Sequence, residues 1–221
     1  DGAFGALAAL LPEYQNKLIG MHRADSLAFD LHKWMHIPYE AGCLLVKDAE
    51  RHKQAFEYVP DYLMRHDRGI PAGPYYFSNL GIELSRGFKS LKVWFSLKEH
   101  GAGAYQKLIR QNIAQAKYLT GLIEKHAELE LLAPVPLNIV CFRFVSEKVD
   151  AQKLNELNKE ILMELHEQGI AAPSFTVLHG KYAIRVAICN HRSRKEDFEV
   201  LLKEAIRIGK EMAEKFVDGN E

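Results

Sequence analysis

The carboxyl-terminal half of the sequence has the pattern that most restricts the possible fold. Residues 138–145 are apolar and β-prone, whereas residues 151–168 carry apolar side chains at helical spacing. Two further β-prone runs, 175–179 and 182–189, predict an antiparallel pair joined by Gly180-Lys181, and residues 193–216 predict a final helix. Elements in this order predict a small α+β domain of about three strands with helices on one face.

The amino-terminal half predicts a different arrangement. Residues 26–31 and 42–47 are β-prone and predict two strands at the end of a parallel or mixed sheet. After a short helix near residues 50–56, a segment rich in Pro and Gly predicts a long loop to residue 80, which is typical of lids, binding segments or disorder. Apolar spacing then predicts a helix over 84–100, ended by Gly101, and a longer amphipathic helix over 104–126.

Composition narrows the possible partners. The chain has 29 basic and 29 acidic residues, so no global field favours nucleic acid or a membrane surface. No apolar run approaches the roughly 20 residues that a membrane-spanning helix needs. The three cysteines, Cys43, Cys141 and Cys189, lie in or beside apolar β-prone runs, which favours buried thiols in a reducing cytoplasm. Their spacing predicts no metal site.

Lys33 is the strongest candidate for a reactive residue. It follows the predicted strand that starts at Ser26, in the sequence His32-Lys33-Trp34. A lysine at the end of a strand would be delivered by a rigid element into a cleft. Desolvation there favours the neutral amine, which is the form that adds to an aldehyde. An ordinary surface lysine is the alternative, because most lysines are exposed.

Four segments in order carry a resemblance to a known family: Asp1–Gly5, Ala24–Trp34, Pro60–Leu63 and Leu84–Trp94. Together they resemble the group II pyridoxal-phosphate-dependent amino acid decarboxylases, which include aromatic-L-amino-acid, tyrosine, histidine and glutamate decarboxylases. A weaker likeness continues through residues 140–144 and 182–189, so the resemblance covers essentially the whole chain.

The resemblance implies an α/β fold of the fold type I pyridoxal-phosphate-dependent transferase kind. Residues 1–127 would be the carboxyl-terminal part of the cofactor-binding large domain, and residues 128–221 the small α+β domain. Family members are about twice as long and place the Asp-Gly-Ala-Phe-Gly element in their middle. We therefore expect the chain to be the carboxyl-terminal half of an enzyme.

The resemblance also assigns roles near the cofactor. Lys33 would carry pyridoxal 5'-phosphate as a Schiff base, and Asp1 would pair with the pyridine nitrogen. Ala3 would lie beneath the ring, and His32 near the phosphate and imine. Asp30 aligns with a position near the phosphate, where its carboxylate would repel the dianion unless it faced another donor. Packing or solvent-exposed roles are the alternatives for each.

Three more residues have a predicted role in the reaction. Tyr62 matches a loop tyrosine that protonates the substrate carbon, whereas aldehyde-forming relatives have phenylalanine there. Arg185 lies on a predicted strand and would bind the substrate carboxylate, or else point to solvent. Arg86 matches an arginine near the active-site floor, with a structural ion pair as the alternative.

The expected activity is decarboxylation of an L-amino acid to its amine. The variant Pro38-Tyr-Glu-Ala-Gly-Cys43 slightly favours an aromatic substrate. The expected state is a cytoplasmic homodimer with the active site at the subunit interface. An aldehyde synthase or another fold type I lyase is the first alternative. A catalytically incomplete piece that only packs or dimerises is the second.

Overall fold

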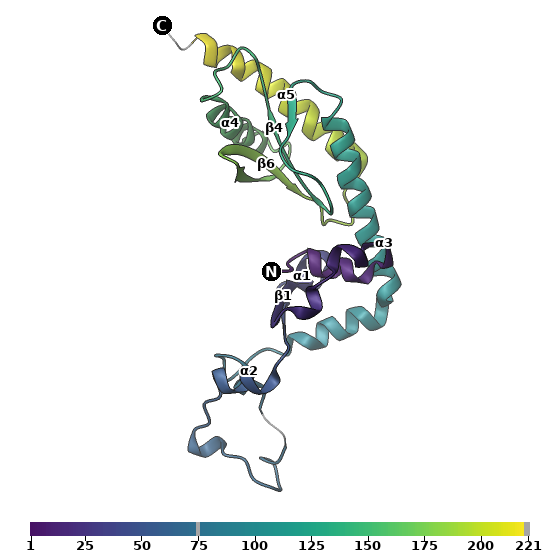
Figure 1. Ribbon diagram of the computed structural model, residues 1–221, viewed down its shortest axis with the longest axis vertical. Coiled ribbons are helices and arrows are strands. Elements are labelled where there is room, and N and C mark those ends of the chain that lie inside the picture. Colours follow the sequence, from purple (N-terminus) through teal and green to yellow (C-terminus); the bar gives the residue numbers. More distant parts are fainter. Residues whose placement is uncertain (74–75, 219–221) are drawn as a thin grey trace. The chain divides into compact units, whose positions relative to one another are not determined.

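The computed structural model describes residues 1–73 and 76–218 (Figure 1). It divides into two compact units, Asp1–Tyr105 and Gln106–Glu221. The elements, with η for 3-10 helices, are η1 (Gly5–Leu10), η2 (Pro12–Leu18), η3 (Met21–Arg23), β1 (Ser26–Asp30), α1 (Leu31–Trp34), β2 (Gly42–Val46), α2 (Ala49–Phe56), η4 (Asp61–Leu63), η5 (Phe77–Leu80), α3 (Lys89–Ile123), β3 (Leu129–Leu131), β4 (Ile139–Phe144), α4 (Leu154–Glu167), β5 (Ser174–Leu178), β6 (Lys181–Ala187) and α5 (Lys195–Asp218).

The second unit is built on an antiparallel sheet of order β3-β4-β6-β5. The prediction of about three strands missed β3, whose three residues Leu129–Leu131 are too few to show an alternating pattern. The β5–β6 hairpin is confirmed, but its turn consists of His179 and Gly180, both at positive φ, and Lys181 already pairs with Leu178. A two-residue turn of this kind matches the twist of the strands it joins.

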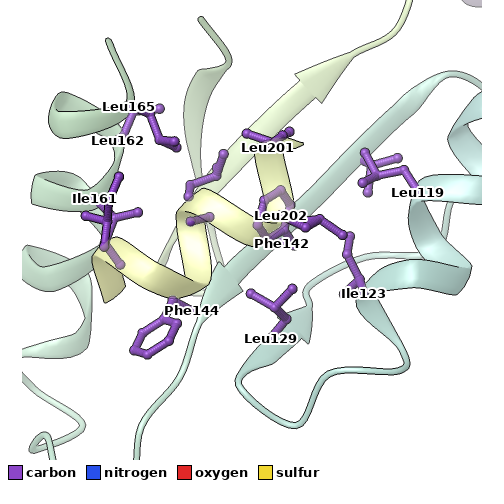
Figure 2. Packing of buried hydrophobic residues seen from close by; sticks show 14 of the residues in the cluster. Leu119, Ile123, Leu129, Phe142, Phe144, Ile161, Leu162, Leu165, Leu201 and Leu202 are labelled. Atoms are coloured by element: carbon purple, nitrogen blue, oxygen red, sulfur yellow. The ribbon is translucent and has the colours of Figure 1, made fainter. Parts of the chain in front are cut away.

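One face of this sheet carries the core. Val140, Phe142 and Phe144 alternate along β4 and are buried against α4 and α5, which also contact each other. Figure 2 shows Phe142 and Phe144 among leucines and isoleucines of the helices, including Ile161 and Leu202. The predicted α+β arrangement, with helices gathered on this face, is therefore present.

A buried asparagine ties α4 to the sheet. The side-chain amide of Asn158 donates to the Phe144 carbonyl at 2.9 Å, and its Oδ1 accepts the Phe144 N–H at 2.7 Å. Because Asn158 is fully buried, these bonds satisfy polar groups that would otherwise be costly to bury.

The first unit contains the two strands expected from residues 26–31 and 42–47. β1 and β2 pair antiparallel from Ser26 opposite Val46 to Asp30 opposite Gly42, which the expected mixed sheet allows and a purely parallel sheet does not. The following helix α3 begins at Lys89 and not at Leu84, and it continues past Gly101 to Ile123. Gly101 is nevertheless non-helical, with φ 69° and ψ 164°, so the predicted boundary is a kink.

The break between the compact units falls inside α3, between Tyr105 and Gln106. The predicted boundary between a large and a small domain at residues 127 and 128 remains a prediction.

Two glycine-to-alanine substitutions should change stability in opposite directions. A Cβ at Gly209 in α5 would approach the Phe144 ring to 2.6 Å, whereas one at Gly121 in α3 would meet nothing within 4 Å. We expect Gly209→Ala to lower the free energy of unfolding by about 1–3 kcal/mol, through overpacking. Gly121→Ala should raise it by about 0.5–1 kcal/mol, through helix propensity.

Urea denaturation followed by far-ultraviolet circular dichroism measures both changes. A Gly209→Ala protein as stable as the parent would contradict the close packing of α5 on Phe144.

Candidate active site

Lys33 lies on a short helical turn that is anchored at both ends. β1 ends at Asp30, and α1 follows at once; the Leu31 N–H donates to the Ala41 carbonyl at 2.9 Å. Trp34 is fully buried and meets the Phe4 ring edge-on, with centroids 5.8 Å apart. β1 and α1 can be followed near the amino terminus in Figure 1. The rigid element expected before Lys33 is therefore present.

The Lys33 amine is held between a carboxylate and an aromatic ring. Its Nζ is 2.6 Å from Asp30 Oδ2 and 5.4 Å from the centroid of the Phe4 ring. The Lys33 side chain is 37% exposed. Asp30 thus faces a cationic donor, so the negative charge of its carboxylate is paired. Phe4 was not predicted as a site residue, although it lies in the Asp1–Gly5 motif.

His32 is fixed by a backbone hydrogen bond. The Ala41 N–H donates to its Nδ1 at 3.0 Å, so the neutral ring carries its hydrogen on Nε2. Nε2 is 3.8 Å from Asp30 Oδ1. The Tyr39 ring lies beside the imidazole, with centroids 4.6 Å apart. Asp30 therefore pairs with Lys33 through Oδ2, while its Oδ1 lies near His32 at a distance too long for a hydrogen bond.

A pocket of about 330 Å³ brings other predicted residues together. Asp1, Ala3 and Asp30 line it, with Ala28, Phe29, Gly42, Cys43 and Leu44. Asp1 Oδ1 accepts the Ala3 N–H at 2.9 Å, and the Gly2 N–H donates to the Ala28 carbonyl at 2.7 Å. These bonds place the Asp1–Ala3 turn against β1. Sequence reasoning missed Cys43 in this pocket; burial raises the pKa of its thiol.

Tyr62, Arg86 and Arg185, like Lys33 and His32, are not among the residues that line this pocket. Tyr62 is on η4 and is 76% exposed. Arg86 precedes α3 and donates from Nη2 to the Glu83 carbonyl at 3.4 Å. Arg185 belongs to the second compact unit, on β6, where its Nη1 donates to Ser174 Oγ at 3.3 Å. Arg185 faces Cys141 in the strand register, and burial raises the pKa of that thiol although the arginine opposes the rise.

Residues 1–145 match the family model of the pyridoxal-dependent decarboxylase conserved domain. The chain belongs to this family. It is 36% identical over 205 residues to an aromatic-L-amino-acid decarboxylase of Bacillus atrophaeus, covering 92% of the chain and 42% of that protein. It is 33% identical over 195 residues to a phenylacetaldehyde synthase of Petunia hybrida, covering 85% of the chain and 38% of that protein.

The structural likeness agrees with the sequence match. The crystal structure of Oryza sativa TDC with PLP and tryptamine superposes with a TM-score of 0.86 at 26% identity, covering 96% of this chain and 44% of that one. The predicted fold type I architecture and the predicted family are confirmed. This chain spans about two fifths of the length of the two relatives named above.

Two classes of feature are absent from residues 1–73 and 76–218. No helix there is long and apolar enough to cross a bilayer. The same residues contain no group of three or more His, Cys, Asp or Glu side chains arranged to hold a metal ion.

Gly2 and Gly42 offer a matched pair of substitutions. A Cβ at Gly2 would lie 2.7 Å from Ala6 Cβ and 3.0 Å from Leu27 Cδ1 of β1, whereas one at Gly42 would meet only Asp30 Oδ1 at 3.9 Å. We expect Gly2→Ala to cost about 1–3 kcal/mol of stability by overpacking, and Gly42→Ala to cost less.

The midpoint of urea unfolding, followed by tryptophan emission, checks this expectation, because Trp34 and Trp94 both lie in the first unit. Equal midpoints for the two variants would show that the Asp1–Ala3 turn is not packed tightly on β1.

Proposed function

We propose that the protein containing this chain is a pyridoxal 5'-phosphate-dependent carboxy-lyase that converts an L-amino acid, preferably an aromatic one, to its amine. The observation that carries the proposal is the position of Lys33. Its amine follows β1, pairs with Asp30, and neighbours a pocket lined by Asp1 and Ala3. The aromatic-L-amino-acid decarboxylase relative supports the reaction and the substrate class.

The donor set of the pocket, together with the adjacent Lys33 and His32, fits this cofactor. Lys33 supplies an amine for the cofactor aldehyde, and Asp1 supplies a carboxylate for the proton on the pyridine nitrogen. Ala3 has a small side chain, which leaves room for a flat ring. His32, with its hydrogen on Nε2, is a donor suited to an anionic group. When bound, the cofactor supplies an electron sink for the electron pair left after loss of carbon dioxide.

Residues of this chain would hold and donate the protons that the reaction needs. Asp1 would hold the proton on the ring nitrogen, and Asp30 would stabilise the charged form of the Lys33 amine when that amine is not bonded to the cofactor. The phenol of Tyr62 would deliver a proton to the substrate carbon after decarboxylation, from a segment that closes over the site. Its exposure in the structure is compatible with such a mobile role.

Arg185 is proposed to bind the substrate carboxylate. One of its five N–H donors bonds to Ser174 Oγ, and a planar guanidinium suits bidentate binding of a carboxylate. The alternative is that Arg185 is a surface residue that stabilises the β5–β6 hairpin through its bond to Ser174.

We also propose a cytoplasmic homodimer with the active site at the subunit interface. Large apolar side chains are exposed between residues 82 and 97, as expected of an interface: Ile82, Leu84, Phe88, Leu91, Trp94, Phe95 and Leu97. Cys43, Cys141 and Cys189 form no disulfide, as expected in a reducing compartment.

An aldehyde synthase is the second candidate. The phenylacetaldehyde synthase of Petunia hybrida is nearly as similar as the decarboxylase relative, so similarity alone does not separate the two reactions. Tyr62 favours the decarboxylase, because a phenol can donate a proton and a phenyl ring cannot.

Lys33 should form a borohydride-reducible bond with pyridoxal phosphate. Peptide mass spectrometry after reduction should find the pyridoxyl group on Lys33, and Lys33→Ala should remove it and abolish decarboxylation in the full protein. Lys47 is the matched control. It is an exposed lysine directly after β2, whereas Lys33 lies three residues after the end of β1. No adduct on Lys33 would favour a catalytically incomplete piece; normal turnover in Lys33→Ala would refute the assignment.

Tyr62→Phe should shift the full protein from amine toward aldehyde production, because the carbon loses its proton donor. The two products can be separated and quantified by liquid chromatography. Tyr58→Phe is a suitable control, since Tyr58 is exposed in the same part of the chain. Unchanged amine output with no aldehyde would argue against the proton-donor role.

A further inference from the structure

The short segment Pro38–Ala41 forms one wall beside His32. Its last residue, Ala41, donates its N–H to His32 Nδ1 at 3.0 Å and accepts the Leu31 N–H at 2.9 Å. The ring of Tyr39 lies beside the imidazole. The position of this segment therefore determines both the tautomer of His32 and the environment of its ring.

Two lysines at the start of α3 also contact this segment. Lys89 Nζ donates to Glu40 Oε1, and Lys92 Nζ donates to the Pro38 carbonyl at 2.7 Å. Residues three apart lie on one face of a helix, so a single turn of α3 contacts both Pro38 and Glu40. The hydrogen bond and charge of Lys89 hold the pKa of Glu40 below its usual range, and Glu40 in turn raises the pKa of Lys89.

We propose that Lys89 and Lys92 are positioning residues for His32, acting through the Pro38–Ala41 segment. The proposal rests on the proposed function of the Lys33 site. The side chains of Lys89 and Glu40 are 46% and 57% exposed, so water competes with this ion pair taken alone. The charge-assisted bond from Lys92 to a backbone carbonyl holds the segment at a second point.

The contacts form a continuous path from α3 to the reactive amine. Lys92 and Lys89 contact the segment, Ala41 directs His32, and His32 Nε2 lies 3.8 Å from the carboxylate that binds Lys33. Loosening the segment would free His32 Nδ1 from its donor. The ring could then rotate or exchange tautomers, and Asp30 would lose a fixed neighbour.

The test measures the His32 ring directly in the full protein labelled with ¹⁵N-histidine. At pH 8, where an ordinary histidine is neutral, long-range ¹H–¹⁵N spectra distinguish the two tautomers. We expect a single Nε2–H tautomer in the parent protein, with His32→Gln used to assign the signals. Lys89→Met combined with Lys92→Met should produce a mixture of both tautomers, and Glu40→Gln combined with Lys92→Met should do the same.

Two controls separate positioning from general loss of structure. Lys98→Met removes a lysine on the same helix that lies over Trp94 and should leave the His32 signals unchanged. Lys89→Arg with Lys92→Arg keeps both donors and should restore the single tautomer. Far-ultraviolet circular dichroism confirms that each variant is folded.

A second readout connects the positioning to the reaction. We expect bonding of Lys33 to pyridoxal phosphate to be roughly fivefold slower in the double methionine variant, well short of the ~100-fold that a 1 Å misplacement can cost. Unchanged His32 signals in that variant would overturn the proposal. Absence of the Lys33 adduct in the parent protein would instead defeat the proposed function, and the tautomer measurement would still decide whether these lysines position His32.

Discussion

The antiparallel pairing of β1 with β2 is the constraint on which the candidate site depends. The register places Asp30 opposite Gly42, and one further backbone bond joins Leu31 to Ala41. Residues 31–41 form a loop whose two ends are held together by this pairing. Inside it, Trp34, Met35 and Ile37 are buried, so the segment cannot slide along the strands without exposing them. Lys33 is thereby held at one position relative to Asp30.

The electrostatics of the site follow from this geometry. Lys33 has its counterion three residues earlier, at the last position of the strand, and the same carboxylate faces His32. An ion pair that is about one third exposed stays accessible to small reactants and is only partly screened by water. The carboxylate thus gives the charged amine a counterion without burying it.

Helix propensity and apolar spacing predicted most elements but not their ends. The pattern over 84–100 predicted a helix from Leu84, but Gly87 disfavours helix, and α3 begins after it at Lys89. Phe88, Trp94 and Phe95 supply the helical stripe, yet they are exposed in this structure, so the pattern indicated a buried face without identifying what covers it. β3 escaped prediction because its pairing with β4, rather than its own residues, makes it a strand.

The sequence alone made Lys33 a candidate, because its residue type and the β-prone run before it are local properties. The resemblance to the decarboxylase family, and not spacing by itself, added Asp1, Ala3, Asp30 and His32 as candidates. Only the tertiary structure decided that the Asp1–Ala3 turn docks on β1, that Asp30 faces Lys33, and that α3 holds the segment beside His32. Those contacts join residues distant in the chain, and they depend on packing and backbone bonds that no local pattern records.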